Sequence, residues 1–379
     1  MRFENTTLGQ LSIKGKGSYG IAASAVPYSD ELFTYLRITD INDDGTINKS
    51  GLMSVSEEKA EQYLLKPNDI VFARTGGSTG RNYFYDGSDG EFVFAGFLIR
   101  FSIDDKKVNP LFIKYYCQSQ IYKGWVHSFN TGSTRGNINA QTYANMPIIL
   151  PPREQQDLLV NTLSVIDAKI AVNKAINENL EQQAQAIFKS WFVDFEPFGG
   201  AMPDDWRMGT LSEIAEINSG KRPPMRQADK TDNVYVPLVG AASVMGYTNE
   251  SNHSDKILVI GRVGTHGIVQ RFNIPCWTSD NTLVLTSPYY EYTYQVLKRI
   301  DYTAMNRGST QPLITQGDMN KAEIFLPDEK YILKYESLVG TLFAQYEHNR
   351  AENENLAALR DTLLPKLMNG EIDVSEVNI

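Results

Sequence analysis

The chain has 379 residues, of which 42% are hydrophobic and 21% charged, and this length favours two domains with sizeable buried cores. Its formal net charge of −9 argues against a protein that coats DNA nonspecifically. We see no apolar run long enough to span a bilayer, no secretory signal and no Cys-x-x-Cys pair, and so expect a cytoplasmic protein with Cys117 and Cys276 as reduced core thiols.

Residues 1–152 are expected to form a first domain of mixed α+β type. The apolar runs 69–73 and 92–99 predict buried strands, and 110–116 has the spacing of a short amphipathic helix. Two loops combine basic, hydroxyl and glycine residues, a mixture that suits base edges and phosphates. The candidate DNA-binding residues of these loops are Arg74, Thr75, Ser78, Thr79, Arg81, Ser133, Thr134, Arg135 and Asn137.

Residues 153–196 predict a long central helix, and the Gly- and Pro-rich residues 197–204 predict a hinge after it. Along the helix, apolar residues and a central Asn pair recur at alternating spacings of four and three, which is a heptad seam. We expect the seam to pack on a partner helix. The seam residues are Leu163, Ile166, Ile170, Asn173, Asn177, Leu180 and Trp191.

The sequence after the hinge repeats the sequence before it. Phe-Asn-Thr-Gly-Ser-Thr-Arg at 129–135 matches Met-Asn-Arg-Gly-Ser-Thr-Gln at 305–311. The same offset continues without a gap to Asn-Glu-Asn-Leu at 177–180 and again at 353–356. Earlier in the chain the offset is larger, so the second copy has lost loops. An internal duplication, with a pseudo-twofold relation between the copies, explains this pattern.

Residues 205–330 are therefore expected to form a second domain of the same mixed α+β class. The runs 256–260 and 282–285 predict buried strands, and 292–297 predicts a short helix. Basic and polar loops recur at similar places. The candidate DNA-binding residues of this domain are Lys221, Arg222, Arg226, Arg262, Thr265, His266, Arg307, Ser309, Thr310 and Gln311.

Each of these loops also has a purely structural interpretation, because Gly-Ser-Thr turns are usually only turns. Arg74 and Arg262 follow strands at equivalent places, so a scaffold ion pair common to both domains is the alternative to a DNA contact. Residues that differ between the copies, such as Arg135 against Gln311, are better candidates for specificity. A bipartite asymmetric target needs two domains that read different sequences.

Residues 331–370 predict a second long helix, followed by a tail at 371–379. Its seam has the same register as the first, which favours two helices packed on each other in an antiparallel coiled coil. The alternative is that each helix lies alone on its own domain. The Asn pairs would fix the register. The seam residues of this helix are Val339, Leu342, Tyr346, Asn349, Asn353, Leu356 and Leu363.

An antiparallel helix pair with a similar domain at each end suits a ligand that has two sites along one rigid axis. Duplex DNA fits this description because its grooves repeat about every 34 Å. The excess of acidic residues falls mainly in the two helical segments, which leaves the domains nearly neutral. Tight binding to phosphates would then need basic partner subunits.

Catalytic motifs are sparse: we find no phosphate-binding GxxxxGK[ST] loop and no nucleophile paired with a base. A metal cluster of His253, His266 and Cys276 is a weak alternative. An active site using His266 and Asp280 is another, and a DNA-binding or scaffolding protein that acts alone is a third.

Motifs at the ends of the long helices resemble the specificity subunit of type I restriction-modification enzymes. Leu-Pro-Pro-Arg-Glu-Gln-Gln at 150–156 looks like the family's Leu-Pro-Pro-x-Glu-Gln helix start. Residues 188–195 and 363–372 resemble the ends of its central and C-terminal conserved regions. The second copy departs from the pattern at 326–330, where the Glu-Gln pair is absent.

The resemblance implies a division of labour. Each target-recognition domain of the family reads one half of a bipartite DNA target, and residues 1–152 and 205–330 would be these domains here. The helices set the gap between the halves, and their seams dock other subunits. Two modification subunits, which bind S-adenosylmethionine, would methylate adenine, and restriction subunits using ATP and Mg would cut unmodified DNA. The resemblance therefore implies a noncatalytic chain that binds double-stranded DNA, holds no cofactor and contacts no membrane.

Overall fold

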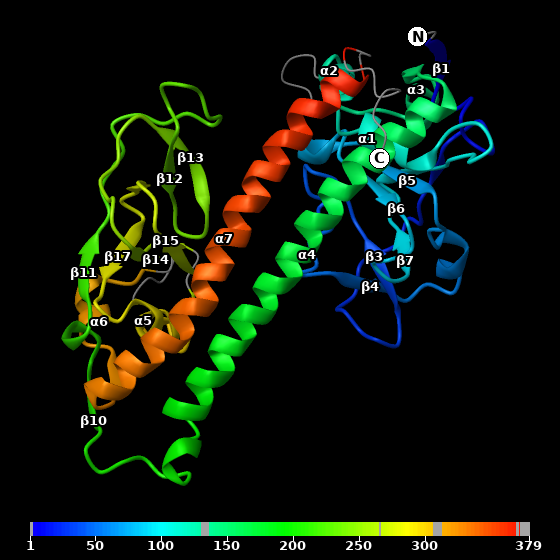
Figure 1. The fold of residues 1–379 in the computed structure, drawn as a ribbon. Coiled ribbons are helices and arrows are strands. Elements are labelled where there is room, and N and C mark those ends of the chain that lie inside the picture. The colour runs from blue at the N-terminus through cyan, green and yellow to red at the C-terminus, as the bar shows by residue number, and fades with distance from the viewer. Residues whose placement is uncertain (1–2, 130–135, 265–266, 306–312, 369–370, 372–379) are drawn as a thin grey trace. The chain divides into compact units, whose positions relative to one another are not determined.

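The computed structural model describes residues 3–129, 136–264, 267–305, 313–368 and 371. The first domain contains nine strands and three short helices, and the first long helix follows it (Figure 1). These elements are β1 (Glu4–Thr7), β2 (Ser18–Tyr19), β3 (Phe33–Leu36), β4 (Met53–Val55), β5 (Asp69–Ala73), β6 (Asn82–Tyr85), β7 (Phe92–Phe94), β8 (Leu98–Ser102), α1 (Pro110–Tyr116), α2 (Gln120–His127), α3 (Ala140–Ala144), β9 (Pro147–Leu150) and α4 (Arg153–Phe192).

The second domain has elements of the same kinds in nearly the same order, followed by the second long helix. They are β10 (Arg207–Thr210), β11 (Glu216–Ser219), β12 (Val236–Val239), β13 (Val244–Thr248), β14 (Ile257–Gly261), β15 (Val269–Phe272), β16 (Trp277–Thr278), β17 (Thr282–Thr286), α5 (Tyr290–Leu297), α6 (Gln316–Asn320), β18 (Glu323–Leu326) and α7 (Glu329–Met368). The predicted mixed α+β class and the duplication are both confirmed.

The duplication is clearest in the strand order of the sheets. A four-stranded sheet has the order β2-β8-β5-β6 in the first domain and β11-β17-β14-β15 in the second. A three-stranded sheet has the order β4-β3-β7 in one and β13-β12-β16 in the other, and β3–β7 and β12–β16 are both parallel pairs. The two-stranded pairs β1-β9 and β10-β18 complete the correspondence. The domains therefore share one topology.

The predicted strand at 92–99 is wrong, because the run forms two strands in different sheets. β7 pairs with β3, whereas β8 pairs with β5. Between them the chain turns, and the Leu98 N–H donates to the Ala95 carbonyl at 2.8 Å. Both strands are almost entirely buried, so no change of hydrophobic pattern marks the break.

The short helices α1 and α3 begin where the sequence supplies a capping residue. Asn109 accepts a hydrogen bond from the Leu111 N–H at 3.0 Å, and Pro110 occupies the first turn of α1. Asn139 accepts one from the Thr142 N–H at 2.8 Å and starts α3. The helix predicted at 110–116 is confirmed, and α5 extends the one predicted at 292–297 by starting at Tyr290.

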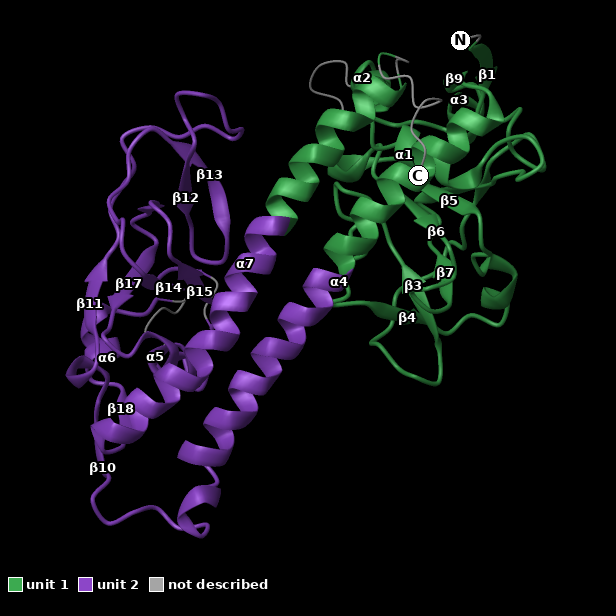
Figure 2. Ribbon diagram, viewed as in Figure 1, with its two compact units in different colours: residues 1–171, 353–379 green, residues 172–352 purple. Residues whose placement is uncertain are grey.

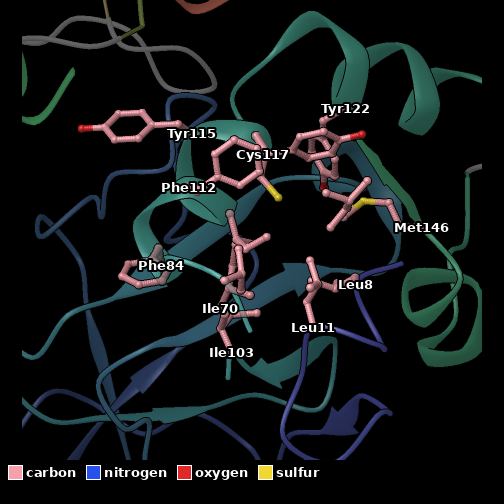
Figure 3. Packing of buried hydrophobic residues seen from close by; sticks show 14 of the residues in the cluster. Leu8, Leu11, Ile70, Phe84, Ile103, Phe112, Tyr115, Cys117, Tyr122 and Met146 are labelled. Atoms are coloured by element: carbon pink, nitrogen blue, oxygen red, sulfur yellow. The ribbon is translucent and has the colours of Figure 1, made fainter. Parts of the chain in front are cut away.

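The core of the first domain is formed by the four-stranded sheet, α1 to α3 and the ends of both long helices. Phe112, Tyr115 and Tyr122 fill it from the short helices, and Ile70 faces them from β5 (Figure 3). Leu159 and Leu163 of α4 and Leu364, Leu367 and Met368 of α7 belong to the same cluster. Cys117 is a buried free thiol here, and burial raises its pKa.

The second domain has a core that is rich in aromatic residues. Phe188 and Phe192 of α4 contact Tyr292 of α5 and Tyr335 of α7, with ring centroids 5.1 to 5.8 Å apart. The Tyr335 hydroxyl also donates to the Ala184 carbonyl of α4 at 3.1 Å. Cys276 is likewise a buried free thiol, and burial raises its pKa to about 11. Both domains thus use the long helices as part of their cores.

The long helices differ slightly from their predicted bounds of 153–196 and 331–370. α4 ends at Phe192, because Phe195 adopts a left-handed backbone (φ 53°) and a 3₁₀ turn follows at Glu196–Phe198. α7 starts at Glu329, two residues early. The predicted hinge at 197–204 therefore starts inside this 3₁₀ turn.

The chain divides into two compact units, and the boundary between them falls within both long helices (Figure 2). The first unit comprises residues 1–171 and 353–379, and the second comprises residues 172–352. Each unit thus holds one domain, part of α4 and part of α7. None of the described helices is both long and apolar enough to cross a membrane.

Candidate nucleic-acid interface

The loop after β5 carries five of the candidate DNA-binding residues. Its turn is built around Gly76 (φ +78°), and the Thr79 hydroxyl lies 2.8 Å from the Gly76 carbonyl and 2.9 Å from the Gly136 carbonyl. Arg81 at the end of the loop donates to Asp43 at 2.6 Å and to the Ile41 carbonyl at 3.1 Å. The loop is therefore held by its own polar residues, and the charge of Arg81 is neutralised.

Arg74 at the start of this loop is in a different situation. Its guanidinium lies over the rings of Tyr19 and Phe97, with the central carbon 5.2 and 5.8 Å from the ring centroids. Its Nε is shielded from solvent and has no hydrogen-bond partner. Among the described residues, no carboxylate lies within ion-pair distance of it. A scaffold ion pair, the structural alternative for this residue, is thus not observed.

The other candidates of the first domain are only partly described. Asn137 is exposed and forms an isolated antiparallel bridge with Thr75, so the two predicted loops meet at this point. Ser78 is half-buried in the turn. The remaining candidates lie outside the described residues, namely Ser133, Thr134 and Arg135.

In the second domain, Arg262 follows β14 in the same way that Arg74 follows β5. It is half-buried, and its Nε is again shielded from solvent without a hydrogen-bond partner. No acidic side chain within the described part of the chain forms an ion pair with it. Its predicted neighbours Thr265 and His266 lie outside the described residues.

The remaining basic candidates of the second domain lie on the segment after β11. Lys221, Arg222 and Arg226 are exposed, and Arg226 donates to the Met245 carbonyl at 3.1 Å. The backbone of Lys221 is fixed, because its carbonyl accepts from the Trp277 indole at 2.8 Å. The last group of candidates lies outside the described residues, namely Arg307, Ser309, Thr310 and Gln311.

The two long helices pair in antiparallel fashion within each unit. In the first unit, Arg360 of α7 donates to Asp167 of α4 at 3.1 Å. In the second unit, the Asn349 side chain donates to Asn177 at 2.9 Å, and the Asn173 side chain donates to Glu352 at 2.7 Å. Residue numbers therefore rise along one helix as they fall along the other. The alternative of two separate surface helices is excluded.

The predicted seam residues all avoid full exposure. Those that are buried are Leu163, Ile166, Asn173, Asn177, Val339 and Asn349, and those that are half-buried are Ile170, Leu180, Trp191, Leu342, Tyr346, Asn353, Leu356 and Leu363. The polar layer is centred on the Asn177–Asn349 pair, and Asn177 also donates to the Tyr346 carbonyl at 3.1 Å. Buried amides that bond each other penalise shifted registers, in which they would be unpaired.

Sequence reasoning missed two groups of residues. Tyr19 and Phe97 flank Arg74 through strand pairing across the domain, and no local pattern signals that contact. Val172 and Ile176, one turn apart on α4, are 53% and 41% exposed outside the seam. Their spacing of four was visible in the sequence, but the seam accounted for the helix without them. Exposed apolar residues on one helix face are a feature of docking surfaces.

The catalytic and metal-binding alternatives gain no support. The described residues include no group of three or more His, Cys, Asp or Glu side chains placed to hold a metal ion. His253 and Cys276 are joined through their backbones, and burial lowers the pKa of His253, with Lys221 adding to the effect. Asp280 is exposed, and His266 lies outside the described residues.

Comparisons with known proteins agree with the duplicated architecture. A family model for the type I restriction modification DNA specificity domain matches residues 4–182 and 203–334. The type I restriction enzyme MjaIX specificity subunit of Methanocaldococcus jannaschii is 26% identical over 304 residues, covering 70% of each chain. The HindI specificity subunit of Haemophilus influenzae is 22% identical over 403 residues, covering 81% of this chain and 87% of that one.

Among solved structures, the S subunit of the type I restriction-modification system from M. genitalium has the same fold. The TM-score is 0.56 at 18% identity, and the match covers 97% of this chain and 96% of the other. The family model alone spans most of the chain and falls on both copies of the duplication. The chain therefore belongs to the type I restriction-modification DNA specificity family.

Proposed function

We propose that this chain is the DNA specificity subunit of a type I restriction-modification complex, a recognition subunit without catalytic activity of its own. Each domain would bind one half of a bipartite, asymmetric target in double-stranded DNA. One observation carries the proposal: the two domains share a strand order but differ in the loops that follow equivalent strands. A common scaffold with different loops is what two unlike half-sites require.

The test is a methylome of the host by single-molecule sequencing, with the gene intact and with it deleted. We expect N6-methyladenine to be lost at one split, asymmetric motif, and that motif would identify both half-sites. An unchanged methylome in a host that expresses the complex would contradict the proposal. We expect the complex in the cytoplasm, because its proposed ligand is the chromosome.

The paired helices would hold the spacing between half-sites and dock two modification subunits, with restriction subunits joining them. Val172 and Ile176 supply exposed apolar surface on α4 for such docking. S-adenosylmethionine, ATP and Mg would then be bound by those partner subunits and not by this chain. Inserting one heptad into each helix is expected to lengthen the gap between methylated half-sites by a fixed number of base pairs. A gap that stays unchanged would contradict the proposal that the helices set the spacing between the half-sites.

The charge distribution supports a complex over a chain that binds DNA alone. The net charge is −9, and the domains are close to neutral. Basic partners would supply most phosphate contacts, so the assembled complex should bind DNA with steep salt dependence while this chain alone binds feebly. Tight binding by the isolated chain at physiological salt would favour a protein that acts alone.

A further inference from the structure

Arg74 and Arg262 occupy the same position in the shared topology, as their backbone hydrogen bonds show. The Arg74 N–H donates to the Phe97 carbonyl at 3.1 Å, and the Arg262 N–H donates to the Asn281 carbonyl at 2.8 Å. The carbonyl of each arginine accepts from an isoleucine N–H, Ile138 at 2.9 Å and Ile314 at 3.0 Å. Phe97 therefore corresponds to Asn281, in the connections that lead into β8 and β17.

The strand on the other side of each arginine also corresponds. Tyr19 in β2 pairs with Ile99 in β8, and Ser219 in β11 pairs with Leu283 in β17. The next residue in each chain segment is glycine, whose N–H donates to the first residue of that neighbouring strand at 3.2 and 3.1 Å. Tyr19 therefore corresponds to Ser219.

What is shared is a cation without a counterion. Each guanidinium is half-buried, each has an Nε shielded from solvent without a hydrogen-bond partner, and the described residues offer neither an acidic partner. Several other arginines form ion pairs, such as Arg81 with Asp43 and Arg271 with Glu291. A shielded polar group without a partner is destabilising. A ligand that brings negative charge would relieve this cost.

What differs is the pair of residues at the two corresponding positions. In the first domain they are Tyr19 and Phe97, which are 43% and 55% exposed and whose rings lie beside the Arg74 guanidinium. In the second domain they are Ser219 and Asn281, which are also exposed but small and polar. The equivalent positions thus carry two rings in one domain and two hydrogen-bonding side chains in the other.

We propose that Arg74 and Arg262 are equivalent contacts to the DNA phosphate backbone, and that the pairs Tyr19–Phe97 and Ser219–Asn281 help to discriminate the two half-sites. The inference rests on the proposed DNA-specificity function. Two unlike half-sites differ in their bases but share their phosphates, so a residue common to both domains suits the backbone. Residues that differ suit the bases, by stacking and apolar contact in one domain and hydrogen bonding in the other.

The first test measures DNA binding by the complex assembled with its modification subunits, on its target duplex and on a scrambled duplex, over a range of salt. Arg74→Ala and Arg262→Ala are each expected to weaken binding to both duplexes by a similar factor, roughly tenfold. Each should also reduce the slope of log affinity against log salt by about 0.9, the value for one lost phosphate contact. Arg207→Ala is the control, since it removes an exposed arginine outside the candidate loops that Glu213 already neutralises.

Three results would overturn the phosphate assignment: unchanged affinity, a loss confined to the target duplex, or an equal loss in the Arg207→Ala control. Arg74→Lys is the conservative control, because it keeps the positive charge and should therefore keep the slope of log affinity against log salt. Loss of that slope in Arg74→Lys as well would indicate misfolding. Assembly of every variant is checked by size-exclusion chromatography. A wild-type complex that does not prefer any bipartite duplex would refute the proposed function instead, which is a distinct outcome.

The second test transplants the flanking pair. The double variant Tyr19→Ser with Phe97→Asn gives the first domain the second domain's flanking residues while Arg74 stays in place. Methylome sequencing should then show a changed or relaxed first half-site and an unchanged second one. If the methylated motif keeps both halves, or changes in both, the discriminating role of the pair is wrong.

Discussion

Replacing Glu336 with glutamine should remove a pH dependence from the stability of the second unit. Glu336 lies on α7, and its carboxylate accepts the Tyr292 N–H at 2.7 Å. It thereby caps α5, which has no side-chain cap from its own sequence. Burial is the main cause that raises the Glu336 pKa from 4.5 to about 7, and the nearby Glu291 carboxylate adds to it. The backbone N–H groups of Tyr292 and Glu291 and the charge of Lys256 act in the opposite direction.

The direction of this pH dependence follows from the protons bound by the folded and unfolded states. Between pH 4.5 and 7 the folded protein keeps the proton that the unfolded chain has lost, so stability falls as pH rises through this window. The full loss, reached above pH 7, is about 3.5 kcal/mol at most, from about 1.4 kcal/mol per pKa unit. Glutamine keeps the acceptor oxygen and carries no charge, so Glu336→Gln should match the wild type near pH 4 and exceed it at pH 8.

The assay is urea unfolding of both proteins across this pH range, with Glu354→Gln on the exposed face of α7 as the control. The control should follow the wild type at every pH. A difference between Glu336→Gln and wild type that stays constant with pH would refute the reasoning. So would a variant that is less stable than the wild type at pH 8, because the ionised carboxylate would then be the better cap.

Three further outcomes are expected in unfolding experiments. Asn177→Leu alone should lower the free energy of unfolding, because the Asn349 amide loses its hydrogen-bond partner. Leu at both positions should restore or raise stability but loosen the helix register, which is detectable as a changed gap between half-sites. Equal effects of the single and double variants would contradict this. Gly80→Ala should lower the free energy of unfolding by about 2–4 kcal/mol, because the residue has φ +90° and a Cβ would lie 2.4 Å from a Val126 methyl carbon. A loss of less than about 1 kcal/mol would contradict this expectation. Tyr335→Phe should lower the free energy of unfolding by about 1 kcal/mol, because it removes the hydrogen bond to α4. An unchanged stability would show that this hydrogen bond makes no net contribution.

The features that the sequence predicted well are those with local or periodic signals. The seam through Leu163 and Val339 was predictable because heptad spacing is read along one helix. The duplication was predictable because its copies align, and the buried strand at 69–73 because it is one short apolar run. The division of 92–99 into β7 and β8 was not predictable, since both strands are buried and the run stays apolar throughout.

The candidate site was harder to predict because its geometry is set by residues far apart in the chain. Arg74 was singled out from its loop, but the rings of Tyr19 and Phe97 reach it only through the pairing of β2, β5 and β8. The absence of a carboxylate partner, which distinguishes Arg74 from Arg81 among the described residues, is also a three-dimensional property. Spacing alone could propose either arginine and could not rank them.

The first compact unit is built from two segments that the whole second unit separates in the sequence, and this has a consequence during synthesis. Leu159 and Leu163 pack with Leu364 and Leu367 in one core, so these contacts of the first domain form only after residues 172–352 have been synthesised. At ordinary translation rates, residue 353 follows residue 171 by roughly 10 to 40 s. Throughout that interval the α7 residues that pack with Leu159 and Leu163 have not yet been synthesised. Losing even the last turns of α7 would damage the domain that was made first.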